Sequence, residues 1–385
     1  MEFSGVKQQY ERYAAELDAA ALEALHSGDY ILGKSVTALE EELAAYVGRK
    51  HCVSASSGTD GLLMALMSEN IGPGDCVFTT AFSFFATAEC IRLTGAAPVF
   101  CDINPDTYNI DPYCLNQVIK RIGREGRLRP RAVITVDLFG LCADYERLED
   151  ICRYNDLVLI EDAAQSMGSE YQSRKAGTFG QYAATSFFPT KPLGCCGDGG
   201  AVFCDDDELA ARLRSIRVHG MGSHKYENVR IGLNARLDEV QAALLRVKLA
   251  HFPDDLARRR DLAARYDRNL EGKVKRQKIS DGLTSSYAQY TIALKDSDQR
   301  HLVQARLEQR NIPSAVYYPV PLNMQQAFRE LAHHDMPNSR QAASRVLSLP
   351  MHPCLSGEEV DRICTCICEA LESYERDCDK FDSGD

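Results

Sequence analysis

The sequence has no tryptophan and no long apolar run. None of its segments reaches the roughly 18 consecutive apolar residues that a membrane-spanning helix needs. Residues 1–30 are charged throughout and lack the apolar core and the cleavage site of a signal peptide. We therefore expect a soluble, cytoplasmic protein without a membrane partner.

Dense basic clusters are also missing. The 55 acidic residues outnumber the 44 lysines and arginines, which gives a formal net charge of -11. No group of basic side chains is dense enough to follow a phosphate backbone. We therefore expect no nucleic-acid partner.

Cysteine is abundant, but its pattern indicates neither disulfides nor a metal site. The 15 cysteines are odd in number and no export signal precedes them, so we expect reduced thiols. Cys364, Cys366 and Cys368 are two residues apart, which puts neighbouring thiols on different faces of a helix. Buried packing is the favoured interpretation for them and for Cys195 and Cys196, which lie in a glycine-rich turn. We predict no metal ligands.

The length of the chain favours two domains. Its 385 residues, 45% of them hydrophobic, exceed what one core usually holds, since single cores stop growing at roughly 250 to 300 residues. We predict domains at 1–250 and 251–385. Seven runs in the first have the character of buried strands: residues 51–55, 76–79, 98–101, 132–136, 157–160, 183–188 and 200–203.

Helical patterns precede, separate and follow these strands: residues 6–26, 35–47, 59–69, 84–94, 112–122, 144–154 and a long region from 206 to 270. Such alternation is typical of a doubly wound α/β fold with a mostly parallel, here seven-stranded, sheet. The remainder is an α+β mixture, with strands expected at 287–294 and 315–318 and helices at 299–310 and 357–373.

Ligands of parallel sheets bind beyond the carboxyl ends of the strands, so we searched the turns there. The turn at 56–61 follows the first strand and opens a helix. Glycines such as Gly58 let the backbone approach an anion, and the N–H groups and dipole of the helix favour phosphate. A helix capped by serine or threonine after a strand looks the same and is the commoner case.

A second turn begins where the strand at 157–160 runs into Glu161 and Asp162. A buried carboxylate needs a partner, and a protonated pyridine nitrogen would supply one. Asp162 would serve equally well as a helix cap.

A third turn contains Lys191 between two apolar strands, flanked by prolines and glycines. Desolvation there lowers the pKa of an amine and favours the neutral form that Schiff-base chemistry requires. A lone lysine in a loop is usually just exposed. However, a phosphate-binding turn, a carboxylate and a lysine follow successive strands in this order, and a pyridoxal-phosphate site needs these three elements.

Five motifs extend this pattern over essentially the whole chain: GTDGL, EDAAQS, TSFFPTKPLG, GDGGAVF and GLNARLDEVQAA. With them the sequence resembles the sugar aminotransferase (DegT/DnrJ/EryC1/StrS) family of fold-type I pyridoxal-phosphate enzymes. The resemblance implies that Lys191 binds the cofactor covalently and then moves the proton. It also implies that Asp162 keeps the pyridine nitrogen protonated and that Gln165 hydrogen-bonds the phenolic oxygen.

The same resemblance assigns the remaining cofactor contacts. Gly58, Thr59 and Ser186 would bind the phosphate. Phe84 matches the position of an aromatic ring that stacks on the cofactor, although a core aromatic residue would leave the same pattern.

In this family a second subunit completes the site. Asn234 is similar to an asparagine that reaches the phosphate across the dimer interface. Arg236 matches a substrate-binding arginine, whose guanidinium suits an anionic sugar or a diphosphate. The resemblance thus implies a homodimer with shared active sites.

Four segments, 28–33, 287–290, 315–322 and 347–353, are most similar to one branch of the family. That branch aminates carbon 3 of a UDP-linked 2-acetamido-3-keto-glucuronic acid for surface polysaccharides, and L-glutamate would be the donor. It has His-Tyr where this chain has Tyr317 and Tyr318, which we interpret as substrate-binding residues. The difference leaves the identity of the sugar open.

The sequence leaves an alternative substrate and two alternative functions open. A dTDP-linked 3-keto-6-deoxyhexose or a 4-keto sugar is the alternative substrate. Family members that dehydrate sugars have histidine in place of the lysine, so Lys191 argues against that activity. A non-catalytic regulator on the same fold would usually carry an added DNA-binding or signalling segment, and we find none in this sequence.

Overall fold

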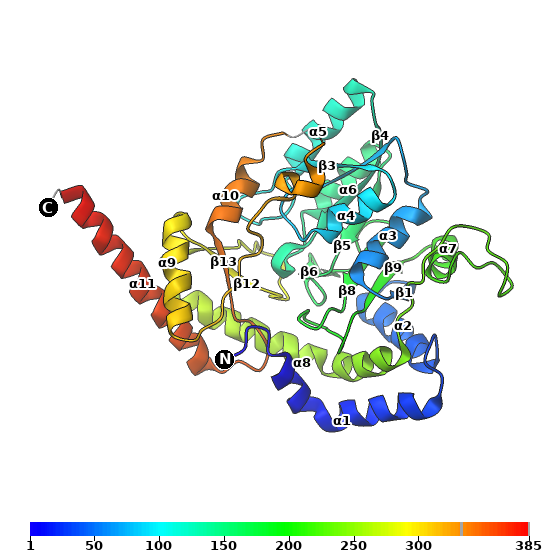
Figure 1. Ribbon diagram of the computed structural model, residues 1–385, viewed down its shortest axis with the longest axis horizontal. Helices are drawn as coiled ribbons and strands as arrows, with labels where there is room; N and C mark the ends of the chain where they lie inside the picture. The colour runs from blue at the N-terminus through cyan, green and yellow to red at the C-terminus, as the bar shows by residue number, and fades with distance from the viewer. Residues whose placement is uncertain (332–333, 384–385) are drawn as a thin grey trace.

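The computed structural model describes residues 1–331 and 334–383, with side chains described as far as residue 376. A seven-stranded sheet with helices on both faces forms its centre (Figure 1). In spatial order the strands are β1 (His51–Ala55), β9 (Gly200–Cys204), β8 (Tyr182–Ser186), β5 (Val158–Asp162), β4 (Arg129–Val136), β2 (Asp75–Thr80) and β3 (Ala97–Cys101).

The sheet is mostly parallel, as the sequence predicts. Strand β9 pairs antiparallel with β1 and β8, and every other pair of neighbours is parallel. All residues of β2 and β9 are buried, which is typical of strands covered on both faces. Because parallel strands end at the same edge, the turns that follow β1, β5 and β8 lie at one edge of the sheet.

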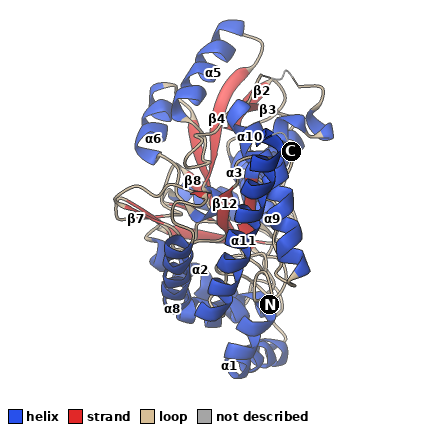
Figure 2. Ribbon diagram, turned by 90° about the vertical axis from the view of Figure 1, so that its left-hand side faces the viewer, coloured by secondary structure: helices blue, strands red, loops and turns tan. Residues whose placement is uncertain are grey.

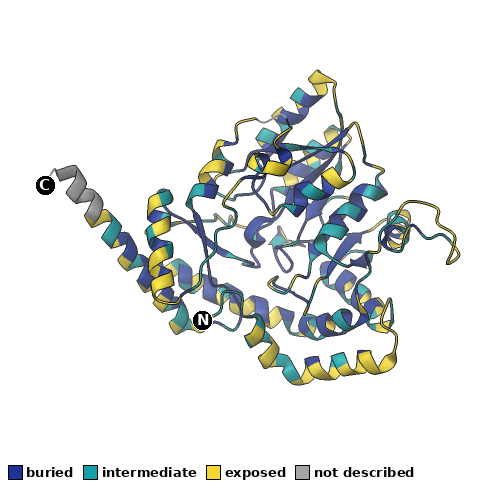
Figure 3. Cartoon of the chain, in the orientation of Figure 1, coloured by how far each residue is buried: buried dark blue, intermediate teal, exposed yellow. Residues whose placement is uncertain are grey.

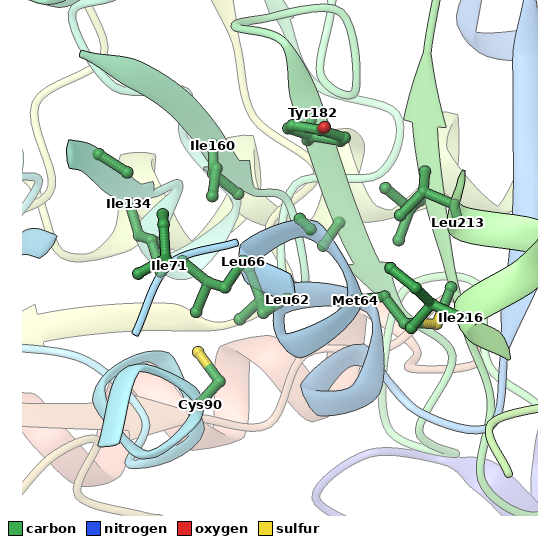
Figure 4. Close-up of a cluster of buried hydrophobic side chains, with 14 of the residues drawn as sticks. Leu62, Met64, Leu66, Ile71, Cys90, Ile134, Ile160, Tyr182, Leu213 and Ile216 are labelled. Carbon is green, nitrogen blue, oxygen red and sulfur yellow. The ribbon is translucent and has the colours of Figure 1, made fainter. Parts of the chain in front are cut away.

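Each face of the sheet has its own helical layer, and Figure 2 shows α3 and α6 on opposite sides of the strands. The first layer comprises α3 (Gly58–Ser68), α4 (Ala86–Leu93) and α7 (Asp207–Arg217). Figure 4 shows its core, where Leu62 and Leu66 of α3 lie among strand residues such as Ile134 and Ile160. The second layer comprises α2 (Lys34–Val47), α5 (Pro112–Glu125), α6 (Tyr145–Tyr154) and α8 (Glu239–Asn269).

A second, smaller core lies toward the C-terminus. Its elements are the end of α8, β12 (Tyr290–Ala293), α9 (Ser297–Gln309), β13 (Val346–Leu349) and α11 (Gly357–Ser383). Cys364 and Cys366 are buried in it, as predicted, whereas Cys368, predicted to be buried as well, is only partly buried. Helix α1 (Val6–Ser27) packs along α8 and is exposed over much of its length (Figure 3).

Helix α8 joins the two cores and passes through the predicted boundary at residue 250. Phe252 and Leu256 still pack in the core under the large sheet, whereas Leu262 and Tyr266 pack in the smaller core. The division of the chain into domains at residue 250 stays a prediction.

Two predictions about secondary structure are wrong. The helical region expected from 206 to 270 is interrupted, because residues 218–238 form a long connection without a helix between α7 and α8. The strand expected at 315–318 is a single β-bridge between Ala315 and Ser348. Pro319 and Pro321 follow it and have no N–H to continue the pairing.

The remaining elements are short. They are η1 (Leu138–Gly140), β6 (Glu170–Tyr171), β7 (Arg174–Lys175), β10 (Lys275–Arg276), β11 (Leu283–Thr284), η2 (Leu322–Met324), η3 (Gln326–Phe328) and α10 (Pro337–Arg345). Among the described residues, no helix has the length and apolar character needed to cross a membrane.

Candidate active site

Asp162 is the last residue of β5 and lies in the centre of the sheet edge. Its side chain is 5% exposed. One carboxylate oxygen accepts a hydrogen bond from the Thr87 hydroxyl at 2.9 Å, and the other accepts one from the Ala164 N–H at 3.2 Å. Burial raises the pKa of Asp162, while the two hydrogen bonds and the charge of Lys191 act in the opposite direction.

Gln165 lies three residues further along the same turn, and its amide has one defined orientation. Its Oε1 accepts a hydrogen bond from the Phe139 N–H at 2.7 Å, so Nε2 points the other way. There Nε2 donates to the Tyr318 hydroxyl at 3.1 Å. Nε2 carries two hydrogens, and the second is left for another acceptor.

Lys191 lies in the tight loop between β8 and β9. Its N–H donates to the Phe188 carbonyl at 2.8 Å, and the Cys195 N–H donates to the Phe187 carbonyl at 2.7 Å. From below, the buried Lys248 amine donates to the Gly194 carbonyl at 2.7 Å. The loop is therefore held at both ends and in the middle.

The amine of Lys191 has the environment that the sequence predicts. Desolvation lowers the pKa of Lys191, and the negative charge of Asp162 acts in the opposite direction. The charge of each group acts on the pKa of the other, so the amine and the carboxylate lie in one site. Cys195 in this loop is buried as expected, but Cys196 is exposed.

The turn after β1 forms a cradle at the start of α3. Ser57 is the N-cap, and its hydroxyl accepts a hydrogen bond from the Asp60 N–H at 3.1 Å. A Cβ at Gly58 would lie 2.8 Å from the Cβ of Ser186, so only glycine fits there. This close approach brings the N-terminus of α3, with Gly58 and Thr59, against Ser186 at the end of β8.

Aromatic rings line the same edge of the sheet. Phe84 is 58% exposed, and its ring centre lies 6.3 Å from that of Tyr318. Tyr317 is next to Tyr318 and makes an edge contact with the ring of Phe3 at 6.2 Å. The exposed face of Phe84 is available to stack on a planar ligand.

Asn234 and Arg236 lie apart from this group, in the connection between α7 and α8. The carbonyl of Ala235 between them accepts a hydrogen bond from the Ser56 N–H at 3.0 Å, so the segment runs beside β1. Asn234 is exposed and Arg236 is part-exposed. Within the described part of the chain, neither side chain makes a hydrogen bond or an ion pair.

Sequence reasoning missed several residues that hold the site together. Thr87 and Phe139 bond directly to Asp162 and Gln165, and the Asp137 N–H donates to the Asp162 carbonyl at 3.2 Å. Of these residues, only Thr87 could have been found from the sequence, because it ends the aromatic segment that contains Phe84. The contacts of Asp137 and Phe139 depend on how the turns meet in space.

These residues fit pyridoxal phosphate. The backbone at Gly58 has no room for a side chain and opens a helix whose N-terminus favours an anion, and the amine of Lys191 has a lowered pKa. The carboxylate of Asp162 is buried without a hydrogen-bonded cation among the described residues, as suits a protonated ring nitrogen. The fold and site define a pyridoxal-phosphate enzyme of fold type I.

Comparison with known proteins gives the family. The model of the DegT/DnrJ/EryC1/StrS aminotransferase family matches residues 11–368. The chain belongs to this family and is a sugar aminotransferase that uses pyridoxal phosphate.

Three characterised relatives match nearly the whole chain. A UDP-2-acetamido-2-deoxy-3-oxo-D-glucuronate aminotransferase of Pseudomonas aeruginosa is 43% identical over 95% of this chain and 99% of its own. A pleiotropic regulatory protein of Geobacillus stearothermophilus is 41% identical over 96% and 98%. A dTDP-3-amino-3,6-dideoxy-alpha-D-galactopyranose transaminase of Aneurinibacillus thermoaerophilus is 36% identical over 97% and 99%.

Solved structures agree. An aminotransferase of the same family from Brucella abortus superposes with a TM-score of 0.93 at 44% identity, covering 96% of this chain and 99% of its own. A putative sugar aminotransferase from Streptococcus pneumoniae, solved in a pyridoxal-phosphate form, gives 0.87 at 26% identity over 93% and 96%.

Proposed function

We propose that this sugar aminotransferase moves the amino group of L-glutamate to carbon 3 of UDP-2-acetamido-2-deoxy-3-oxo-D-glucuronate, for the synthesis of surface polysaccharides. The Pseudomonas aeruginosa relative, 43% identical, supports this substrate. One observation carries the chemistry: Lys191 and Asp162 lie in one site and each influences the pKa of the other.

Lys191 would hold the cofactor and serve as general acid and base. Because its pKa is lowered, a neutral amine is more accessible near neutral pH than on an exposed lysine. The neutral Nζ can take the proton from the α-carbon of glutamate and, in the second half-reaction, deliver a proton to carbon 3 of the sugar. Bound pyridoxal phosphate supplies the electron sink that makes such proton transfers feasible.

Asp162 would keep the ring nitrogen protonated. Asp162 is only 5% exposed, so a neighbouring cation would strongly stabilise its ionised form. A pyridinium N–H would supply that positive charge and donate a further hydrogen bond to the carboxylate. Gln165 would donate its second Nε2 hydrogen to the phenolic oxygen of the cofactor. Its Oε1 already accepts from the Phe139 N–H, and its first Nε2 hydrogen goes to the Tyr318 hydroxyl.

The cradle would bind the phosphate. N–H groups at Gly58 and Thr59, at the positive end of α3, attract an anion. The Cβ of Ser186 lies beside them, and its hydroxyl would add a further donor to the phosphate. Phe84 would place its exposed ring against the face of the cofactor.

We further propose a homodimer in which Asn234 and Arg236 reach the partner's site. The connection that carries them also exposes Tyr226 and Ile231, which are 88% and 84% accessible. Exposed apolar side chains on one projecting segment are typical of a surface that a second subunit covers. Asn234 would then bind the phosphate of the partner's cofactor.

Arg236, Tyr317 and Tyr318 would bind the sugar nucleotide. No described residue neutralises the Arg236 guanidinium, which is therefore available to the sugar carboxylate or the diphosphate. The Tyr318 hydroxyl accepts a hydrogen bond from Gln165 and keeps its own hydrogen for a sugar oxygen. Tyr317 lies against its ring, with centres 5.6 Å apart.

An alternative substrate is a dTDP-linked 3-keto-6-deoxyhexose, which the Aneurinibacillus thermoaerophilus relative favours. The test is to offer L-glutamate and a panel of UDP- and dTDP-keto sugars to the purified enzyme and to identify the products by mass spectrometry. We expect the UDP-3-keto-uronate to gain an amino group fastest. Faster amination of the dTDP sugar would overturn the assignment, and no amination of any sugar would favour a regulatory role.

A further inference from the structure

The residues just before α1 lie beside the loop that follows β13, although the two segments are at opposite ends of the sequence (Figure 1). The Met351 N–H donates to the Phe3 carbonyl at 3.3 Å. Nε2 of His352 lies 3.2 Å from the Glu2 carbonyl, and it must carry the hydrogen because a carbonyl oxygen only accepts. We call residues 2–5 the N-terminal strap.

Gly5 places the strap directly against the ring of His352. This histidine is 1% exposed. A Cβ at Gly5 would lie 2.3 Å from its Nδ1 and 2.5 Å from its Cγ. Gly5 also has a φ of +62°, a left-handed conformation that residues with a side chain rarely adopt. The position therefore requires glycine, and the strap passes in direct contact with a buried ring.

The start of α1 fixes the strap on its other side. Three side chains converge there on Asp255 of α8, which is 2% exposed. Gln9 donates to its carboxylate at 3.0 Å and the Tyr13 hydroxyl donates to it at 2.9 Å. The Arg12 guanidinium lies 3.6 Å from the same carboxylate. The strap is thus attached to the rest of the protein on both sides of Phe3.

Phe3 brings the strap to the proposed substrate site. Its ring makes an edge contact with Tyr317, with ring centres 6.2 Å apart and planes inclined by 64°. Aromatic pairs in this arrangement attract each other, because the positive edge of one ring faces the negative face of the other. Phe3 itself is only partly buried.

Tyr317 belongs to a segment that its own backbone supports poorly. Within the described part of the chain, no N–H group between residues 316 and 320 donates a hydrogen bond. The segment is held at its ends, by a β-bridge at Ala315 and a backbone hydrogen bond at Leu322. Packing of the side chains must therefore place the tyrosine rings between these two points.

That packing is a row of aromatic contacts with the tyrosine pair in its middle. Phe82 and Phe84 contact Tyr318, with ring centres 6.2 and 6.3 Å away. Tyr318 contacts Tyr317 at 5.6 Å, and Tyr317 contacts Phe3. If Phe3 is removed, Tyr317 keeps Tyr318 as its remaining contact among the described aromatic rings.

We propose that Phe3 is a positioning residue for the sugar substrate: the N-terminal strap holds its ring against Tyr317, and this contact sets the affinity of the tyrosine pair for the keto sugar. This inference rests on the proposed role of Tyr317 and Tyr318 in sugar binding. L-Glutamate lacks the sugar oxygens that the tyrosines would contact, so the effect of Phe3 is confined to the second half-reaction.

The first test compares Phe3→Ala with Phe3→Tyr in the full-length holoenzyme and follows each half-reaction by absorbance, with the keto sugar that the wild type aminates fastest. Phe3→Ala should raise the KM for this sugar by about three- to tenfold, the contribution of one aromatic pair, with kcat and the glutamate half-reaction within about twofold of the wild type. Phe3→Tyr keeps the ring and should stay near the wild type. Tyr113→Ala, which removes a ring that is 72% exposed on α5, is the control.

Three results of this comparison would overturn the proposal. They are an unchanged KM for the sugar in Phe3→Ala, equal losses in the two half-reactions, and a failure of Phe3→Tyr to restore the wild-type KM.

The second test displaces the strap and leaves Phe3 unchanged. In Gly5→Ala the new Cβ would overlap the His352 ring, so the strap must shift. Gly126 has the same φ of +62°, but a Cβ there meets nothing within 4 Å, so Gly126→Ala adds the backbone strain without the displacement. Gly5→Ala should raise the KM for the keto sugar as Phe3→Ala does. Equal KM values for the two glycine variants would contradict a role of the strap.

Nitration of Tyr317 needs no sugar and separates this inference from the proposed function. Tetranitromethane modifies accessible tyrosine rings, and peptide mapping gives the rate at each one. Nitration of Tyr317 should be about three- to tenfold faster in Phe3→Ala than in the wild type, because the lost contact makes local opening easier. Faster nitration with an unchanged KM would contradict the proposed sugar contact of Tyr317. An unchanged nitration rate would show that Phe3 does not hold Tyr317 and would overturn the inference itself.

Discussion

Asp162 and Asn234 belong to the same proposed site but have different surroundings. Asp162 ends a buried strand, is 5% exposed and accepts two hydrogen bonds within its own chain. Asn234 lies in a long connection and is exposed, and its side chain makes no hydrogen bond with any described residue. The sheet thus fixes the first residue before any ligand arrives, whereas no contact of its side chain with a described residue fixes the second.

The same contrast separates two halves of the site. The proposed cofactor half comprises Gly58, Asp162, Gln165, Ser186 and Lys191, which lie at the ends of β5 and β8 or in the turns that follow β1, β5 and β8. The proposed substrate half comprises Arg236, Tyr317 and Tyr318, which lie in long connections, as does the proposed phosphate ligand Asn234. Rigid elements position groups more precisely than loops do, so we expect the chemistry common to the family to depend on the sheet and the choice of substrate on the loops.

Substitutions in the two halves test this contrast, and we expect the largest effect on activity at Lys191 in the proposed cofactor half. Lys191→Ala should reduce transamination by at least about 10⁴-fold, since both the cofactor attachment and the proton carrier are lost. Single-turnover assays with L-glutamate measure this. Lys120→Ala, an exposed lysine on α5, is the control and should retain wild-type rates.

Asp162→Asn should have the next largest effect. The amide keeps the shape of the side chain and can still bond to Thr87 and Ala164, but it lacks the charge that protonates the ring nitrogen. We expect kcat to fall by about 10²- to 10³-fold with little change in the urea midpoint. A rate close to wild type would remove Asp162 from the chemistry.

In the substrate half, Arg236→Ala should act selectively. A charge-assisted contact is worth about 1.5 to 3 kcal/mol, so kcat/KM for the keto-uronate should fall by about tenfold to hundredfold. The matching keto-hexose, uncharged at carbon 6, should be affected far less, and Arg214→Ala on α7 should affect neither. Equal losses for both sugars would assign the guanidinium to the diphosphate.

The same variant tests the shared site. Inactive Lys191→Ala subunits and weakened Arg236→Ala subunits, mixed and allowed to exchange, should aminate the keto-uronate faster than Arg236→Ala subunits alone, since one site of each hybrid dimer is then intact. No recovery after demonstrated exchange would place both residues in the site of one subunit.

Gly58→Ala should give the smallest change. Its Cβ would lie 2.8 Å from Ser186, so the start of α3 must shift. We expect affinity for the cofactor to fall by about tenfold, at a cost of about 1 to 3 kcal/mol in stability. At Gly123 a Cβ meets nothing within 4 Å, so Gly123→Ala should leave affinity unchanged when both are titrated by absorbance.

The positions of the proposed cofactor residues could be inferred from the sequence more readily than those of the proposed substrate residues, for a physical reason. Asp162 and Lys191 directly follow apolar strands, so their place at the edge of the sheet could be inferred from local patterns. Asp137 and Phe139, which hold the turn from behind, could not be found, because their contacts join segments distant in sequence.

Elsewhere, local sequence patterns did not predict the secondary structure of segments whose conformation depends on tertiary contacts. The connection at 218–238 lies between two helices and was predicted as helical, yet its backbone bonds mostly within the connection and to the end of α7, with one bond from Ser56 after β1. The sequence analysis did not predict strand β13, which has only four residues and ends directly before Pro350. Its partner is β12, which the sequence did predict, although four residues shorter than the expected 287–294.

The most direct test of the account is borohydride reduction of the holoenzyme followed by peptide mapping. Reduction fixes a covalently bound cofactor to its amine. We predict that the added mass lies on Lys191, whose pKa is lowered by burial. Loss of visible absorbance should accompany the modification. Label on another lysine, such as the buried Lys248 in the same region, or an unmodified Lys191 peptide, would contradict the central claim.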